Sequence, residues 1–399
     1  MAQAPITASV GHSTLDDPAS AGKEAAERAV ERLGLLQPKL AVVFASSWLD
    51  APTLIQSIRS VLTDVPLIGG STAGEIVAEG PQNHSCALLL LAGDGLVCGV
   101  GSGENADLSP REAGQQAAHL AAQQLKGQRR AGFLMIGDGL ISGYSEVIRG
   151  LQESLGTGTL IVGATAGDDL QFKSTTQVIN ERALTKSVVG ALFGGQASFG
   201  IGLEHGFFPI SKPHQITKAK ANILYELDGL PAASVYEEYF GSEAMKRMRN
   251  ERLTRASVAF PLGIQQGTAP TRWILRNVFT FRDDGSLLCN AELLENTPVQ
   301  LMIGSRQLAI DAAYRAAKQA VQSLNRVACV IIFDDAARRT LLGNQYAALE
   351  CERMRDAIGP NTPLIGCYTY GEHAALGATS GLERTTIQTG SVLAIALGT

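Results

Sequence analysis

The sequence lacks the short motifs that identify common catalytic and metal-binding classes. It has no G-x-x-x-x-G-K-[ST] phosphate loop, no G-x-S-x-G nucleophile turn, no H-E-x-x-H metal motif and no C-x-x-C pair among its six cysteines. The run GGSTAGE at 69–75 approaches a nucleophile turn, but its serine precedes Thr-x-Gly. The run GVGSGENAD at 99–107 lacks the glycine spacing of a dinucleotide-binding turn. These absences predict that the protein is not an enzyme.

Basic tracts and long apolar runs are also missing. Lys and Arg number 33 against 38 Asp and Glu, so the net charge of −5 argues against a nucleic-acid partner. The longest uncharged apolar stretch, 86–93, is too short to span a bilayer. Residues 1–17 have no charged segment followed by an apolar one, so they do not resemble a signal peptide. With scattered cysteines, these features predict a cytoplasmic protein without membrane insertion.

A threefold internal pattern is the most informative feature that is present. In each copy an apolar strand is followed by a helix, a second short strand and the turn Thr-x-Gly-acid. In copy one the strand, the helix and the turn-bearing strand are expected at 40–48, 50–62 and 66–75. In copy two they are expected at 132–139, 142–155 and 159–169, and in copy three at 327–335, 337–358 and 363–373. Another apolar strand closes each copy, at 85–93, 187–195 and 390–399.

An amphipathic helix precedes each copy, at roughly 18–34, 109–127 and 305–323. Apolar strands alternating with helices predict an α/β protein with mixed, largely parallel sheets covered on both faces by helices. The repeated unit is helix-strand-helix-strand-hairpin, with two copies in the N-terminal part and one in the C-terminal part. Because ligands of such sheets bind beyond the carboxyl ends of the strands, the turns are placed at the binding edge.

The chain length of 399 residues predicts more than one domain. Copies one and two are contiguous, whereas a polar stretch, a charged helix and a β-hairpin at about 206–300 separate them from copy three. Gly206, Pro209 and Pro213 interrupt the pattern near 206–215. We therefore expect domains at 1–210 and 211–399.

The same segments resemble the FIST family. VVFASSW, PLIGGSTAGEI and Gly202-x-x-His205-Gly206 resemble its N-terminal domain. YELDGLPAASVYEEY, the arginine of WILRNV (Arg276) and PLIGCYTYGEH resemble its C-terminal domain, so the resemblance covers nearly the whole chain. It implies a small-ligand sensor in bacterial signal transduction, with amino acids as proposed ligands. Lacking an output domain, the chain is expected to act through a partner such as a histidine kinase or a cyclic-di-GMP enzyme; homo-oligomerisation is left open.

The residues of the three turns, together with Arg276, form the predicted ligand site. A carboxylate can hold a ligand ammonium, and the Arg276 guanidinium can pair with a ligand carboxylate, so the pair suits an amino-acid zwitterion. The predicted ligand-binding residues are Ser71, Thr72, Gly74, Glu75, Thr165, Gly167, Asp168, Arg276, Tyr368, Thr369, Tyr370 and Glu372. The competing interpretation is that each Thr-x-Gly-acid closes a turn and leaves its acid solvated.

The resemblance also admits an alternative, since one branch of the family is similar to haem-binding, nitric-oxide-responsive proteins of two-component systems that regulate a partner histidine kinase. His205 would then ligate the iron of haem b, with Phe207 and Phe208 as walls of the pocket. The sequence also admits an enzyme with Cys367 or Ser71 as nucleophile, and a pure interaction module. His373, which follows the third turn acid, is expected to be solvated.

Overall fold

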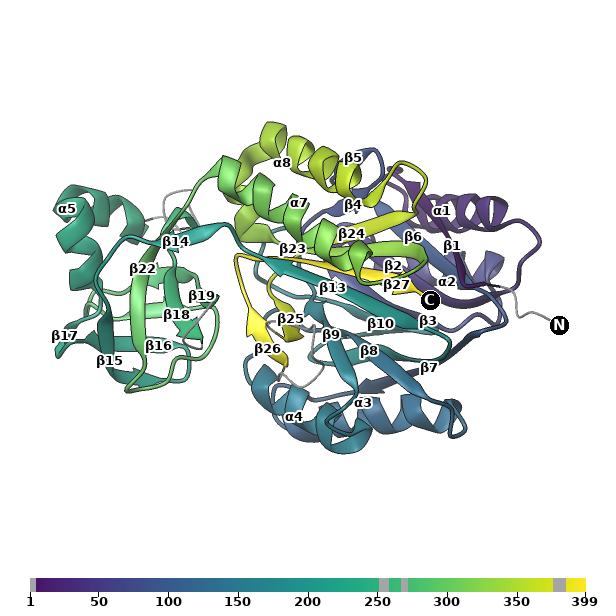
Figure 1. Ribbon diagram of the computed structural model, residues 1–399, viewed down its shortest axis with the longest axis horizontal. Coiled ribbons are helices and arrows are strands. Elements are labelled where there is room, and N and C mark those ends of the chain that lie inside the picture. The colour runs from purple at the N-terminus through teal and green to yellow at the C-terminus, as the bar shows by residue number, and fades with distance from the viewer. Residues whose placement is uncertain (1–4, 251–257, 267–271, 376–384) are drawn as a thin grey trace.

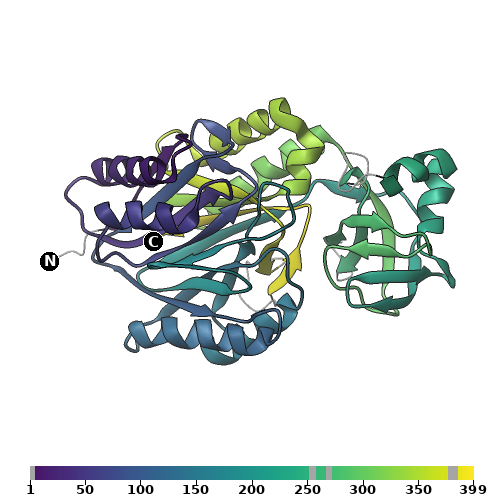
Figure 2. The ribbon, with the colours of Figure 1, turned by 180° about the vertical axis from the view of Figure 1, so that it is seen from behind.

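Three six-stranded sheets and their covering helices make up most of the molecule (Figure 1). The structure is a computed structural model that describes residues 5–250, 258–266, 272–375 and 385–399. Residues 5–206 and 305–399 form what we call the three-sheet body. Residues 207–304 form a separate β-rich part, the insert lobe, which lies to one side of the body in both views (Figures 1 and 2).

The first sheet combines strands from the first copy with one hairpin from the second. Its order is β1 (Thr7–Ser13), β6 (Cys86–Ala92), β2 (Pro38–Ser46), β3 (Leu67–Thr72), β10 (Gln177–Ile179) and β11 (Arg182–Leu184). Helices α1 (Pro18–Leu33) and α2 (Ala51–Val61) cover its outer face through buried alanine, leucine and isoleucine side chains. The Asp50 carboxylate starts α2 by accepting the N–H of Thr53.

The second sheet has the same pairing order. It contains β7 (Leu96–Gly103), β12 (Val188–Gly195), β8 (Arg130–Gly137), β9 (Leu160–Thr165), β25 (Glu372–Ala375) and β26 (Thr385–Gln388). Its outer face is covered by α3 (Pro110–Gln124) and α4 (Tyr144–Leu155).

The third sheet repeats that order once more, with strands β13 (Ser198–Glu204), β27 (Val392–Gly398), β23 (Val327–Asp335), β24 (Leu364–Thr369), β4 (Glu75–Val77) and β5 (Gly80–Gln82). Helices α7 (Arg306–Gln322) and α8 (Ala336–Ile358) cover it, and α8 is kinked at Gly343. Each sheet thus takes its last two strands from another copy, so the hairpins β4–β5, β10–β11 and β25–β26 lock the three sheets together.

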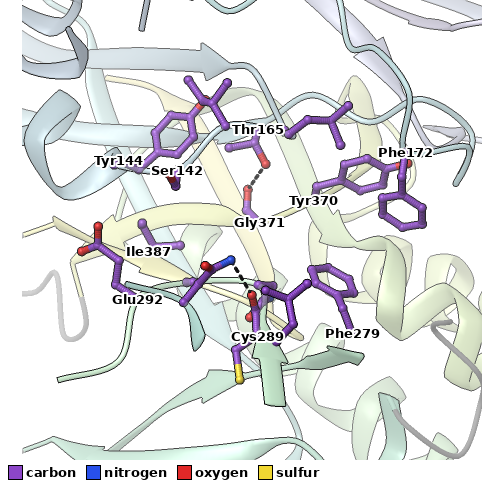
Figure 3. Close-up of a pocket in the computed structure, with 18 residues that line it drawn as sticks. Ser142, Tyr144, Thr165, Phe172, Phe279, Cys289, Glu292, Tyr370, Gly371 and Ile387 are labelled. Carbon is purple, nitrogen blue, oxygen red and sulfur yellow. Dashed lines mark hydrogen bonds between the residues drawn. The ribbon is translucent and has the colours of Figure 1, made fainter. Parts of the chain in front are cut away.

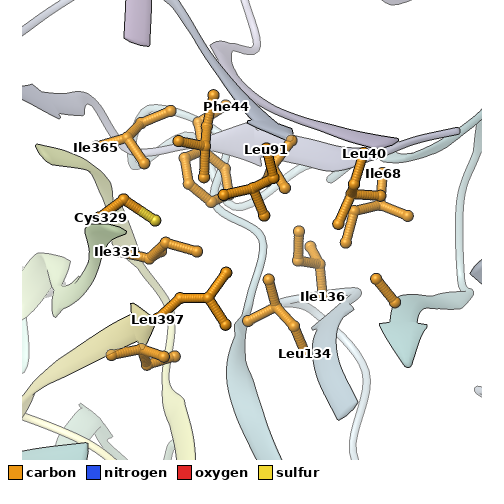
Figure 4. Packing of buried hydrophobic residues seen from close by; sticks show 14 of the residues in the cluster. Leu40, Phe44, Ile68, Leu91, Leu134, Ile136, Cys329, Ile331, Ile365 and Leu397 are labelled. Carbon is orange, nitrogen blue, oxygen red and sulfur yellow. The ribbon is translucent and has the colours of Figure 1, made fainter. Parts of the chain in front are cut away.

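The inner faces of the three sheets share one hydrophobic core (Figure 4). Phe44 and Leu91 enter it from the first sheet, Leu134 from the second, and Ile331 and Leu397 from the third. All five are at most 1% exposed. Burial of so many large side chains in one cluster makes the three sheets a single packing unit.

The sheets are mixed, as predicted, but mainly antiparallel. Among the described strands, parallel pairing is limited to β2 with β3, β8 with β9, and β23 with β24. Helices cover one face of each sheet, whereas the other face packs on the neighbouring sheets. The expectation of largely parallel sheets with helices on both faces is therefore corrected. The closing strands run antiparallel, and their inner faces are apolar because they lie in the common core.

The insert lobe is built on a nine-stranded sheet that packs against helix α5 (Ala233–Asn250). Its strands are β14 (Phe207–Pro209), β15 (His214–Lys220), β16 (Ile223–Leu227), β17 (Leu230–Pro231), β18 (Leu262–Gln266), β19 (Arg272–Arg276), β20 (Val278–Phe281), β21 (Leu287–Cys289) and β22 (Pro298–Gly304). Because residues 305–399 return to the three-sheet body, the spatial division of the molecule differs from the sequential division at 210/211. Among the described helices, none has both the length and the apolar character needed to cross a membrane.

Candidate functional site

The three Thr-x-Gly-acid turns meet at one end of the three-sheet body, where β3, β9 and β24 end. Backbone hydrogen bonds join each turn to the other two. The N–H of Ala73 donates to the carbonyl of Tyr368 (2.9 Å). The N–H of Gly167 donates to the carbonyl of Ser71 (3.0 Å), and the N–H of Thr165 donates to the carbonyl of Gly371 (2.9 Å). The turns therefore converge, but most of their polar groups are used to hold one another.

The acids of the first and third turns are enclosed in matching networks. Glu75 is fully buried and accepts hydrogen bonds from the hydroxyls of Thr72 and Ser85. Burial raises the pKa of Glu75 to about 7, against the lowering effect of the two hydroxyl hydrogen bonds. The carboxyl is part of the interior and is absent from the lining of the cavity described below.

Glu372 repeats this arrangement with different partners. It is fully buried and accepts hydrogen bonds from the hydroxyls of Thr369 (2.5 Å) and Ser391 (2.5 Å). Burial, and next the nearby charge of Asp335, raise the pKa of Glu372 well above its usual range. Neither Glu75 nor Glu372 is solvated, so the interpretation of solvated turn acids is wrong for these two residues.

Asp168, the acid of the second turn, has a different role. Its carboxylate accepts the N–H groups of Phe172 (2.8 Å), Lys173 (2.6 Å) and Ser174 (3.0 Å). It also accepts the hydroxyl of Tyr370 from the third turn. One buried carboxylate thus fixes both the loop that follows β9 and the side chain of Tyr370.

A cavity of about 290 Å³ lies beside this second turn, between the three-sheet body and the insert lobe (Figure 3). The body contributes the segment between β8 and α4, part of the second and third turns, and strand β26. The insert lobe contributes β20, β21 and the residues that follow β21. The lining residues are Gly139, Leu140, Ile141, Ser142, Gly143, Tyr144, Thr165, Phe172, Asn222, Phe279, Leu288, Cys289, Asn290, Ala291, Glu292, Tyr370, Gly371 and Ile387.

Polar groups gather on one side of the cavity. Figure 3 shows Glu292 and Ser142 on the side away from Phe172. Helix α4 begins here after Gly143, whose φ of 90° is in the left-handed region, and no side chain caps its first turn. Free N–H groups at a helix start favour an anionic group, whereas the Glu292 carboxylate favours a cation. This side can therefore accommodate both ends of a zwitterion.

Aromatic rings form the other side. The rings of Phe172 and Tyr370 are stacked, with centroids 4.8 Å apart and planes inclined by 19°. Phe279 of the insert lobe meets Phe172 edge to face at 5.8 Å. The contact between Phe172 and Phe279 joins the body to the insert lobe at the cavity wall.

Arg276 lies behind the cavity and stabilises its walls. Its guanidinium donates to the carbonyls of Leu275 (2.9 Å), Glu292 (2.9 Å) and Ile387 (3.4 Å). Burial lowers the pKa of Arg276 to about 10. Nearby, the hydroxyl of Thr389 donates to the carbonyl of Leu275 (2.8 Å) and adds a second tie between body and lobe.

Of the predicted ligand-binding residues, the structure brings two, Thr165 and Tyr370, to the cavity lining. Asp168 and Arg276 lie directly behind lining residues. The remaining predicted residues are in the ring of turns and do not line the cavity: Ser71, Thr72, Gly74, Glu75, Gly167, Tyr368, Thr369 and Glu372. Backbone hydrogen bonds between the turns and hydroxyl hydrogen bonds to Glu75 and Glu372 already occupy many of their polar groups.

Sequence reasoning missed Phe172, Phe279 and Glu292. They belong to three segments far apart in the chain, and no spacing rule connects them. The one available signal was the run Asp168-Asp169 followed by a polar loop containing a single aromatic residue. That signal identifies a loop but not its neighbour in the insert lobe.

The surroundings of His205 do not form the haem pocket that the alternative requires. Its Nδ1 accepts the N–H of Phe207 (2.9 Å), and burial lowers its pKa to about 4, so the ring is neutral. Phe208, the second expected wall, is 47% exposed. His205 does not line the cavity. These residues do not fit haem.

The candidate nucleophiles and His373 are buried in the interior. Burial raises the pKa of the Cys367 thiol, and the Ser71 hydroxyl donates to the carbonyl of Gly167 (2.7 Å). His373 is fully buried and packs on the Tyr144 ring at 4.8 Å, so the expectation that it is solvated is wrong. His373 belongs to β25, which pairs with β9 on one side and with β26 on the other.

Comparisons with known proteins give one family. Residues 39–230 match the model of the FIST N domain, and residues 232–375 match the model of the FIST C domain. An uncharacterized protein of Methanocaldococcus jannaschii is 26% identical over 239 residues, which is 57% of this chain and 45% of that protein. The chain thus matches less than half the length of this relative.

Two solved structures show weak similarity. A cyanuric acid hydrolase is 9% identical with a TM-score of 0.37, and the alignment covers 99% of this chain and 99% of that one. The PurLQS structure from Thermotoga maritima is 10% identical with a TM-score of 0.24, covering 98% of this chain and 72% of that one. TM-scores this low do not establish a common fold.

Proposed function

Because the chain belongs to the FIST family, whose domains are associated with small-ligand sensing in signal transduction, we propose that it is a sensor whose ligand binds between the three-sheet body and the insert lobe. The proposed ligand is amino-acid-like. The observation that carries the proposal is the polar side of the cavity, which Glu292 and the start of α4 both line. Glu292 would hold the ammonium, and the N–H groups at the start of α4 would hold the carboxylate.

The position of the cavity supports a sensing role. Both parts of the molecule line it, so a bound ligand contacts the body and the insert lobe together. A ligand shifts an equilibrium between lobe positions by its differential affinity for them. The output is proposed to pass to a separate partner, either a histidine kinase or a cyclic-di-GMP enzyme.

Calorimetry with the twenty L-amino acids tests the binding proposal, with Glu292→Gln as the diagnostic variant. The expected result is binding to the native chain, weakened about tenfold or more by Glu292→Gln, because a hydrogen bond to a charged group is lost. Glu238→Gln, in an exposed position on α5, is the matched control and should bind normally. An analogue that lacks the amine should bind the native chain and Glu292→Gln equally. Binding of no amino acid would contradict the proposal.

The proposal also includes the absence of catalysis. The cavity thiol, Cys289, is buried and its pKa is raised to about 12, so the reactive thiolate is scarce at neutral pH. Chloroacetamide should leave Cys289 and Cys367 unmodified in the native chain, as read by mass spectrometry. Rapid labelling of either thiol that is blocked by ligand would support an enzyme instead.

The alternative of a haem-bound nitric oxide sensor has less support. The cavity lining contains no histidine, and Phe208, one of the two walls expected around His205, is 47% exposed. An absorbance spectrum after expression with added haem distinguishes the two functions. A stoichiometric Soret band that His205→Ala removes would favour the alternative.

A further inference from the structure

We propose that the ligand is an amino acid with an aromatic side chain, an inference that rests on the proposed function and specifies its ligand. The carrying observation is the wall of Phe172, Tyr370 and Phe279 on the side of the cavity away from Glu292 (Figure 3). An amino acid whose ammonium lies at Glu292 would direct its side chain toward these rings.

The wall is assembled from three separate elements. Phe172 belongs to the loop between β9 and β10, Tyr370 to the third turn and Phe279 to β20 of the insert lobe. Aromatic pairs prefer offset stacking or edge-to-face contact at centroid separations of about 4.5–7 Å. Both contacts of Phe172 are of this kind, so a further ring can join the cluster in the same geometry.

The wall is ordered before ligand binds. Asp168 fixes Phe172 through its backbone N–H and Tyr370 through its hydroxyl. The loop includes positive φ angles at Asp169 (53°), Leu170 (62°) and Phe172 (53°), which side-chain-bearing residues adopt rarely. The three N–H groups bound by Asp168 hold the backbone in this form. A preorganised wall costs the ligand little ordering entropy, which favours selective binding.

The chemistry of this side favours an uncharged ring over a cationic group. Asp168, the carboxylate next to the rings, already accepts four hydrogen bonds. Leu288 and Ala291 add apolar surface to the lining. A ligand guanidinium or ammonium on this side would lose its hydration shell and would find no carboxylate free to pair with it. The volume of about 290 Å³ is at the lower limit for small-molecule sites, as expected for one amino acid.

Calorimetry on the full chain tests the inference, with L-phenylalanine, L-tyrosine, L-tryptophan, L-leucine and L-arginine as probes. The variants are Phe172→Leu and Phe279→Leu, which keep an apolar side chain and remove a ring. Phe208→Leu, at an exposed position, is the matched control. At least one aromatic amino acid should bind about tenfold or more tightly than leucine, and each cavity variant should lower that advantage several-fold. The control should preserve it.

The outcomes separate the two proposals. If leucine binds as tightly as the aromatic amino acids, or if arginine binds most tightly, the aromatic assignment is overturned while the amino-acid sensor stands. If Phe172→Leu and Phe279→Leu leave the preference unchanged, the wall is not the specificity element and the inference also fails. If no amino acid binds, the proposed function fails and the inference fails with it.

Discussion

The Asp168 carboxylate binds the hydroxyl of Tyr370, although the two residues lie 202 positions apart in the chain. The same carboxylate binds the N–H of Phe172, whose ring stacks on Tyr370. Asp168, a turn acid predicted to contact ligand, therefore lies directly behind the cavity wall. Its side chain orders the rings that a ligand would meet.

Substitution of Asp168 by Asn should weaken ligand binding by about tenfold, because the amide cannot accept from all four donors and the rings lose their fixed position. Calorimetry with the tightest amino acid measures the effect. The neighbouring Asp169→Asn is the control, since Asp169 holds Ser46 and Ser47 at the end of β2. Equal affinities for the two variants would contradict the positioning role.

The buried Glu75 predicts a stability that falls as the pH rises. Its pKa is about 7 in the folded chain and 4.5 in the reference state, so the folded state binds the extra proton. Between these two pH values the free energy of unfolding should decrease as the pH rises. The total decrease should reach about 3 kcal/mol once the pH is above 7. Below pH 4.5 both states are protonated and the contribution of Glu75 is constant.

Urea unfolding at pH 5 and pH 8 measures this effect. Glu75→Gln should show a smaller decrease in stability than the native chain, because the amide does not ionise. Glu79→Gln, whose side chain is 54% exposed, should behave like the native chain. A decrease that is the same in Glu75→Gln and the native chain would show that Glu75 does not titrate in this range.

Local sequence patterns predicted the elements well. The strand expected at 327–335 is β23, Val327–Asp335, because a continuous apolar run ends there in two acids. The helix expected at 50–62 is α2, whose start is fixed by Asp50. Such features depend on neighbouring residues, so the sequence contains enough information to place them.

Pairing between distant segments could not be predicted in the same way. Hairpin β10–β11 leaves its own copy and pairs with β3, and nothing in its three-residue strands identifies that partner. The burial of Glu75 had a signal in the sequence. A serine stands directly before the closing strand in copies one and three, Ser85 and Ser391, and each donates to the turn acid of its own copy, Glu75 or Glu372. For the cavity, the polar loop after Asp168-Asp169 indicated the segment of Phe172, but nothing in the sequence connected it with Phe279, the ring that the insert lobe adds to the wall.

Arg276→Met should destabilise the fold as well as the cavity. The buried guanidinium donates to the carbonyls of Leu275, Glu292 and Ile387, and the substitution removes these hydrogen bonds, although Leu275 keeps the one from Thr389. A loss of about 1–3 kcal/mol in the free energy of unfolding is expected from urea denaturation. A residue that served only to bind ligand would leave the stability of the ligand-free chain unchanged, which would restore the original prediction for Arg276.

The ion cluster around Arg338 gives the largest expected loss of stability. Arg338, Asp334 and Glu350 have side chains with no exposed surface, and the guanidinium bonds Asp334 Oδ1 at 2.6 Å and also binds Glu350. It further donates to the carbonyls of His205 (2.8 Å) and Ala309 (3.0 Å), next to the passage into the insert lobe. Removing the cation leaves two buried acids unpaired, which raises their free energy in the folded state.

Arg338→Met should therefore lower the free energy of unfolding by about 3–5 kcal/mol, measured by urea denaturation at pH 8. Arg353→Met is the matched control, because Arg353 pairs with Asp356 on the surface and such pairs contribute about 0–1 kcal/mol. Since the pKa of Glu350 is raised by burial and by Asp334, adding Glu350→Gln to Arg338→Met should recover part of the loss. If the double variant is no more stable than Arg338→Met, the cost arises from lost packing and not from unpaired charge.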